Sequence, residues 1–68
     1  MESTYKVIEL IGTSPNSWEE ASKNAVDTAR KSLQDIRIAE AVEFDMKIEE
    51  GQVVAYRTKV KLSFKFKE

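Results

Sequence analysis

The sequence predicts an α+β fold with the element order β-α-β-β, and three observations support this. An apolar run rich in β-branched residues stops at Gly12, which is typical of a strand. A polar cluster then leads into a segment whose apolar residues recur every three or four positions from Trp18. Two long segments of alternating polar and apolar residues follow, separated by Glu50-Gly51-Gln52, and together they predict a β-hairpin.

The first strand is expected over Tyr5 to Ile11, where the sequence reads YKVIELI. Ile8 and Leu10 share one face of this strand, whereas Val7 and Ile11 share the other. Both faces are therefore expected to meet apolar surface, one within the subunit and one in a neighbouring subunit.

A helix is expected from about Trp18 to Leu33. Ser17 and Glu20 have the spacing of a capping box, in which the Ser hydroxyl accepts from an amide of the first turn and the Glu accepts from the cap amide. Trp18 lies at the helix start, where packing is favoured over stacking on a planar ligand. The apolar stripe is mostly alanine, which allows close approach to a sheet. Its members are Trp18, Ala21, Ala25, Val26, Ala29 and Leu33.

The hairpin is expected to join Ile36–Glu49 to Val53–Lys67 through a three-residue loop. Residues that face each other in an antiparallel pair share a face, so even positions should face even positions. A two-residue loop would instead place apolar side chains opposite charged ones. The third strand is expected in the centre of the sheet, antiparallel to both others.

This register predicts cross-strand ion pairs on the face away from the helix. Glu43 should face Lys59, and Asp45 should face Arg57. Such pairs are either a solvated outer face, in which each pair contributes about 0.2–1 kcal/mol, or part of a charged interface or ligand surface.

The expected elements differ in length, and this predicts self-association. A helix of about 16 residues is roughly 24 Å long, whereas a strand of about 14 residues reaches roughly 46 Å. We therefore expect another subunit to cover Leu62, Phe64 and Phe66, or the Ile38 end that pairs with them. A single domain spanning residues 1–68 is also small enough to need such extra stabilisation.

The composition excludes several classes of function. The chain has no Cys and no His, so the usual zinc ligands and the commonest general base are missing. It also lacks a Gly-rich phosphate loop and a nucleophile elbow, so no enzyme is expected. A net charge of −1 gives no long-range attraction to nucleic acid or to a membrane. With no long apolar run at the start or elsewhere, a soluble cytoplasmic protein is expected.

Calcium remains possible because it takes only oxygen ligands, six to eight of them. The segment around Asp45 lacks the spacing and the glycine of an EF-hand loop. A metal site could still be assembled between subunits from carboxylates such as Glu43 and Asp45. The alternative is that these two acids only pair with Lys59 and Arg57.

Several stretches resemble one known family over essentially the whole chain. They are the start YKxIELIGTS (Tyr5 to Ser14), the helix start Ser17-Trp18-Glu19, the segment Ala29 to Ser32 and the alternating hairpin through Tyr56 to Phe66. These features look like the dodecins. The resemblance implies a three-stranded antiparallel sheet partly wrapped around one helix, with twelve such subunits in a hollow spherical shell.

Dodecins are best known for binding the flavins riboflavin and FMN, stacked between Trp side chains with a Gln at the edge of the isoalloxazine ring. Alignment with the family puts Ile38 where that Trp stands and Arg57 where the Gln stands. An Ile offers less stacking area, and an Arg donates hydrogen bonds but cannot accept them. The resemblance therefore implies the shell, with Ile38 and Arg57 in an altered flavin pocket.

The subgroup called calcium dodecins looks closer still. The shared features are Asp35-Ile36-Arg37 without the Trp, Glu43 with Asp45-Met46, Tyr56-Arg57 and the ending Ser63-Phe64-Lys65. This similarity implies a non-enzymatic dodecameric shell that binds or stores a cation such as calcium. A flavin-binding dodecin with an altered pocket is the alternative, and a shell that binds no specific small molecule is a third possibility.

Overall fold

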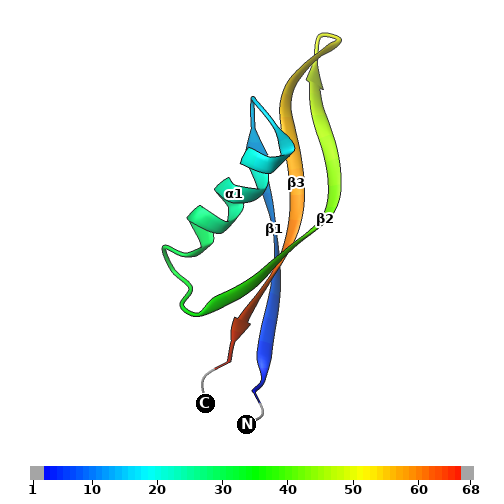
Figure 1. Ribbon diagram of the computed structural model, residues 1–68. Helices are drawn as coiled ribbons and strands as arrows, with labels where there is room; N and C mark the ends of the chain where they lie inside the picture. The colour runs from blue at the N-terminus through cyan, green and yellow to red at the C-terminus, as the bar shows by residue number, and fades with distance from the viewer. Residues whose placement is uncertain (1–2, 67–68) are drawn as a thin grey trace.

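The structure, a computed structural model, describes residues 3–66. Its elements are β1 (Tyr5–Ser14), α1 (Trp18–Ala29), β2 (Ile36–Glu49) and β3 (Gln52–Lys65). The strands form one antiparallel sheet in the order β1-β3-β2, and α1 packs on one face of it (Figure 1). The predicted α+β class, the element order and the central third strand are confirmed.

The first strand is longer than predicted, because β1 continues through Gly12 to Ser14. Gly12 pairs with Thr58 of the central strand, so it does not end the ladder. A Cβ added at Gly12 would lie 2.0 Å from the carbonyl oxygen of Ala21 and 2.9 Å from the Cβ of Ala25. The glycine therefore marks the point where the helix backbone comes closest to β1, and not the end of the strand.

The helix start confirms half of the predicted capping box. The Ser17 side chain accepts a hydrogen bond of 3.0 Å from the Glu20 amide. The amide of Ser17 instead donates to the Ser14 hydroxyl oxygen at 3.3 Å, so it is already bonded. The Glu20 carboxylate accepts from the Ser14 hydroxyl and, at 2.8 Å, from the side-chain amide of Asn16.

The helix ends at Ala29, four residues before the predicted end at Leu33. The amides of Lys31 and Ser32 donate to carbonyls three residues earlier, at 3.2 and 3.1 Å, which tightens the chain into a turn. Asp35 then adopts a φ of 62°, a left-handed conformation that a right-handed helix does not contain. Leu33 fits the apolar spacing because it packs against the core after the helix has ended.

The core lies between α1 and the centre of the sheet. Val60 and Leu62 of β3 are fully buried, and Ile8 and Leu10 of β1 pack beside them. The helix contributes small side chains, as predicted, and this permits the close approach at Gly12. The buried helix residues are Ala21, Ala25 and Ala29.

The hairpin turns through two residues, Glu50 and Gly51, so the predicted three-residue loop is wrong. Their φ angles are 51° and 76°, and two successive left-handed residues are what a type I′ turn requires. Glu49 therefore pairs directly with Gln52. The sequence argument against a two-residue loop assumed that the alternation along both strands is unbroken.

A β-bulge at Val54 breaks the alternation and restores the predicted pairing further along the hairpin. Ile48 pairs with Val53, but the next pair is Lys47 with Ala55, which leaves Val54 as an extra residue on β3. Beyond the bulge, Asp45 faces Arg57 and Glu43 faces Lys59, as predicted.

Two further register shifts, at Arg37 and Val42, change the face that some β2 residues occupy. We call the sheet face away from α1 the outer face. On β3 it carries Ala55, Arg57, Lys59, Lys61, Ser63 and Lys65. Ile38 pairs with Ser63 and so lies on the outer face, although strict alternation would place it on the helix side.

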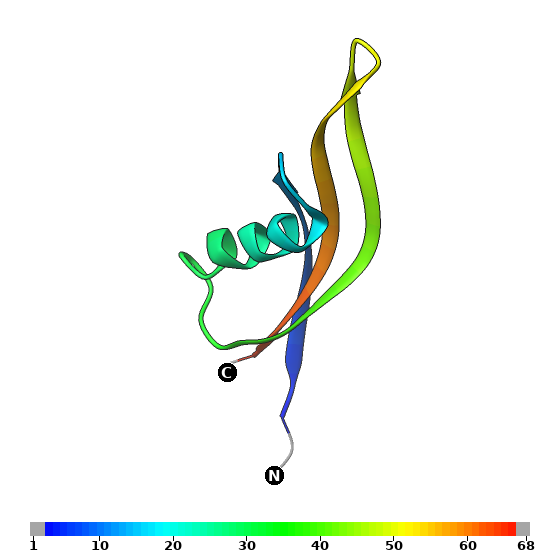
Figure 2. The same cartoon turned by 45° about the horizontal axis from the view of Figure 1, so that its top comes forward.

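The sheet extends well beyond the helix, as predicted (Figures 1 and 2). Twelve helical residues span roughly 18 Å, whereas the molecule is 52 Å long. The predicted uncovered end is confirmed in part, because Ile38 is 60% and Phe66 48% exposed, whereas Leu62 is fully buried and Phe64 is half-buried. Further exposed apolar residues lie at the far end of the hairpin, and we call them the tip patch: Phe44, Met46, Ile48, Val53 and Val54.

Candidate functional site

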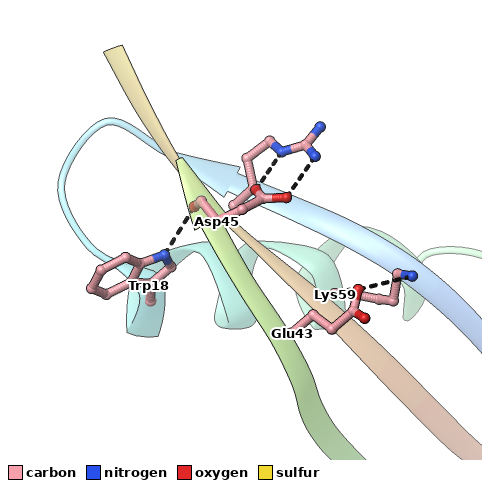
Figure 3. Close-up of polar contacts among 5 residues, drawn as sticks. Trp18, Glu43, Asp45 and Lys59 are labelled. Atoms are coloured by element: carbon pink, nitrogen blue, oxygen red, sulfur yellow. Dashed lines mark hydrogen bonds and ion pairs between the residues drawn. The ribbon is translucent and has the colours of Figure 1, made fainter. Parts of the chain in front are cut away.

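The predicted site residues Glu43 and Asp45 lie on the outer face, each in an ion pair with β3. Nε and Nη2 of Arg57 donate to the two carboxylate oxygens of Asp45 at 2.6 and 2.8 Å. Nζ of Lys59 lies 3.1 Å from a carboxylate oxygen of Glu43 (Figure 3). All four side chains reach solvent, so an ion from outside can approach both carboxylates.

These contacts favour the charged forms of Asp45, Arg57 and Lys59. The hydrogen bonds from Arg57 hold the pKa of the Asp45 carboxyl below its ordinary value. The same bonds raise the pKa of Arg57, and the hydrogen bond to Glu43 raises the pKa of Lys59. A cation that approaches this surface therefore meets carboxylates that already hold positive partners.

Residues 3–66 of one chain do not provide a complete metal site. Glu43 and Asp45 are two positions apart on one strand, or roughly 7 Å. Within residues 3–66, no group of three or more His, Cys, Asp or Glu side chains is placed to hold a metal ion. Because calcium takes six to eight oxygens, these two carboxylates would need ligands from water or from another subunit.

Ile38 and Arg57, the positions predicted for an altered flavin pocket, share the outer face but are far apart. Ile38 pairs with Ser63, six residues along β3 from Arg57, and six strand residues span roughly 20 Å. The side chain of Ile38 is 60% exposed. A pocket that uses both positions would therefore combine one residue from each of two subunits.

Trp18 makes a contact with this site that the sequence did not predict. Its indole Nε1–H donates to the backbone carbonyl of Asp45 at 3.0 Å (Figure 3). Its ring packs edge-on against Phe44 and Tyr56, with centroids 5.9 and 5.1 Å away. The predicted packing role at the helix start is confirmed, but no sequence pattern identifies a backbone carbonyl as the partner.

A second polar cluster, also missed, surrounds the buried Ser14 at the end of β1. The Ser14 hydroxyl donates to Glu20 and accepts from the amides of Asn16 and Ser17, at 2.9 and 3.3 Å. Hydrogen bonds from Ser14 and Asn16 lower the pKa of the Glu20 carboxyl. Because these residues are hydrogen-bonded to one another, the cluster holds the connection between β1 and α1 in one conformation.

Concerning the membrane, no helix within residues 3–66 has the length and apolar character needed to cross a bilayer.

Comparisons with known proteins agree with this architecture. A family model described as Dodecin matches residues 4–67. A curated relative, the calcium dodecin of Mycobacterium tuberculosis, is 49% identical over 96% of this chain and 92% of its own length. The dodecin of Thermus thermophilus is 34% identical over 100% of this chain and 99% of its own.

Solved structures give the same result. The dodecin of Streptomyces coelicolor superposes with a TM-score of 0.91 at 36% identity, covering 97% of this chain and 94% of that one. The Mycobacterium tuberculosis calcium dodecin superposes with a TM-score of 0.85 at 50% identity, covering 96% and 93%. That structure is described as a calcium-chelating antigen with a novel calcium-binding site.

Proposed function

The chain belongs to the dodecin family, and we propose that it forms a non-enzymatic homododecameric shell that binds or stores calcium. The observation that carries the proposal is the pair of charged carboxylates, Glu43 and Asp45, on the exposed outer face. They occur in a chain 49% identical to a protein named calcium dodecin.

In this proposal each subunit contributes Glu43 and Asp45, and the remaining ligands come from water or from a neighbouring subunit. Calcium must compete with Arg57 and Lys59, which already hold these carboxylates. A doubly charged ion can displace Arg57 and Lys59 from the carboxylates, because both side chains are partly exposed and can be solvated when released. The expected affinity is therefore modest, as suits reversible storage.

Calorimetry on chelator-treated protein tests the calcium site. Calcium should bind the wild type, and the double variant Glu43→Gln, Asp45→Asn should bind at least tenfold more weakly. Glu49→Gln is the matched control, since Glu49 is an equally exposed acid on the same strand that pairs only locally, with Lys47. Equal binding by the double variant would place the site elsewhere, and no binding by the wild type would refute calcium storage.

Self-association is supported by apolar surface at both ends of the molecule. The tip patch is exposed at one end. Near the other end, Tyr5, Val7 and Ile38 are exposed on the outer face. The two patches lie on opposite faces, so one can meet the other on a neighbouring copy in a head-to-tail contact. Repetition of such a contact can close a ring, and a second type of contact between rings would complete a shell.

A flavin, riboflavin or FMN, is the second candidate ligand, and the exposed Ile38 favours it. Ile38 presents an uncovered apolar side chain on the face that also carries Arg57. Two subunits could place these residues on either side of a planar ring. Visible absorbance of the protein as purified tests this, because a bound flavin is yellow. A colourless protein that also fails to bind added FMN would exclude the flavin.

A further inference from the structure

Two side chains of helix α1 donate hydrogen bonds to the two edge strands of the sheet. The residues that accept them belong to one row across the sheet. Thr13, Arg57 and Asp45 lie side by side across β1, β3 and β2. Since β3 is central, β1 and β2 are edge strands, whose outward backbone groups have no neighbouring strand within residues 3–66. Asn24 donates to the carbonyl of Thr13 at 3.0 Å, and Trp18 donates to the carbonyl of Asp45 at 3.0 Å.

The two hydrogen bonds differ in the residue that accepts them. Thr13 is not part of the proposed cation site, whereas Asp45 carries one of its carboxylates. The backbone of Asp45 is bonded to Trp18, and its side chain is bonded to Arg57. Asp has a short side chain with three staggered positions about the Cα–Cβ bond, so a shift of the backbone at Asp45 moves the carboxylate with it.

Trp18 is itself held rigidly. Its ring lies edge-on to Phe44 and Tyr56, which flank the site on β2 and β3. Its backbone carbonyl accepts from the hydroxyls of Ser22 and Thr58, at 2.9 and 3.1 Å. A fixed donor of this kind can hold the edge strand β2, which pairs with another strand on one side alone within residues 3–66.

We propose that Trp18 is a positioning residue that fixes the Asp45 carboxylate for cation binding. The indole N–H takes one of the two acceptor positions of the Asp45 carbonyl and so fixes the direction of this peptide group. The inference rests on the proposed calcium function, and it adds a residue from the helix to a site built on the hairpin.

The test compares two variants. Trp18→Phe keeps an aromatic ring but removes the N–H donor, and Asn24→Ala removes the hydrogen bond to the opposite edge strand, β1. Calcium affinity is measured by calorimetry. Trp18→Phe should weaken binding about fivefold or more, whereas Asn24→Ala should stay within twofold of the wild type. Equal affinities of Trp18→Phe and the wild type would overturn the positioning role.

A second measurement separates this inference from the calcium proposal. Proton exchange at Nε–H of Arg57, followed by nuclear magnetic resonance without calcium, reports whether the Asp45 carboxylate stays in place. It should be several-fold faster in Trp18→Phe and unchanged in Asn24→Ala. Unchanged exchange in Trp18→Phe would overturn the inference even if the protein binds calcium. Faster exchange would support the positioning of Asp45 even if the wild type binds none.

The sole tryptophan also offers a test that needs no variant. Because its N–H is bonded to the carbonyl of a proposed calcium ligand, Trp18 emission should change during a calcium titration. The midpoint should match that of the calorimetric curve. Calcium binding without any change in emission would contradict the coupling between Trp18 and Asp45.

Discussion

At the scale of single residues, the two glycines constrain the chain for different reasons. Gly12 lies where the helix backbone touches β1, and a side chain there would meet the Ala21 carbonyl. Gly51 lies in open space at the hairpin turn but has a φ of 76°. Gly12 is required because there is no space for a Cβ, and Gly51 is required because a Cβ disfavours its left-handed backbone conformation.

Alanine substitutions at Gly12 and Gly51 should therefore distinguish a steric clash from an unfavourable backbone conformation. Gly51→Ala should cost about 1–2 kcal/mol, because it forces a left-handed alanine. Gly12→Ala should cost about 3 kcal/mol or more, since a backbone carbonyl cannot rotate away from the added methyl group. Urea unfolding measures both. A Gly12→Ala protein as stable as Gly51→Ala would show that α1 can shift away from the sheet at little cost.

The Ser14 cluster predicts a pH dependence of stability. The folded pKa of Glu20 lies below its ordinary value of 4.5, so the ionised carboxylate stabilises the fold. This contribution is complete above about pH 4.5 and is lost as the pH falls through the lowered pKa. The unfolding free energies of the wild type and Glu20→Gln should therefore differ at pH 7 and converge in acid.

Glu19→Gln is the control for this prediction, because it removes the same charge from the same helical turn outside the cluster. Its stability relative to the wild type should vary less with pH. A difference between wild type and Glu20→Gln that stays constant from pH 7 to pH 3 would contradict the assigned role of the ionised Glu20.

The sequence predicted residue contacts where they follow from strand register. The Asp45–Arg57 and Glu43–Lys59 pairs could be predicted because cross-strand neighbours share a face. The Trp18 contact could not, because its acceptor is a backbone carbonyl that every residue carries. Likewise, the spacing of Ser17 and Glu20 suits a capping box, but only the fold shows that Ser14 already binds the cap amide.

At the scale of elements, hydrophobic periodicity identified all four, but their ends depend on three-dimensional context. Leu33 continues the apolar spacing without being helical, because it packs on the same core. The turn and the bulge compensate each other, so a wrong loop length still led to the right register at Asp45. Alternation alone cannot distinguish a three-residue loop from a two-residue turn followed by a bulge.

Loss of the helix cap should destabilise α1 in particular. Ser17→Ala removes the side-chain acceptor of the Glu20 amide, and such a change costs about 1 kcal/mol. Ser32→Ala, in the turn after the helix, should change stability by less than about 0.5 kcal/mol. Thermal unfolding monitored by circular dichroism measures both variants. If Ser17→Ala is as stable as Ser32→Ala, the Ser17 side chain stabilises the helix no more than a water molecule bound to the Glu20 amide would.

At the scale of the whole molecule, one subunit covers only part of its own sheet. Only five hydrophobic residues among positions 3–66 are buried, and three of them are alanines. So small a core is marginal for an independent domain. The length mismatch and the exposed Ile38 end could be predicted from the sequence, but the exposed tip patch depended on where the helix begins and how the chain returns to β2.

A charge in the tip patch should therefore impair assembly. Phe44→Asp places a carboxylate on an apolar side chain that is 58% exposed in the single subunit. Burial of that charge in a contact between copies is unfavourable, so smaller species are expected by analytical ultracentrifugation. Glu50→Asp, at the turn, is the control for the same end of the hairpin. Full-size assemblies of Phe44→Asp would show that the tip patch is not an interface.

The central claim is a calcium-binding assembly of twelve copies, and native mass spectrometry of the untreated protein tests it most directly. It counts the subunits and records any additional mass in one experiment. We expect a twelve-subunit species that carries increments of calcium mass, which disappear after treatment with a chelator. A monomer, or a twelve-subunit shell that carries no metal even after calcium is added, would contradict the claim.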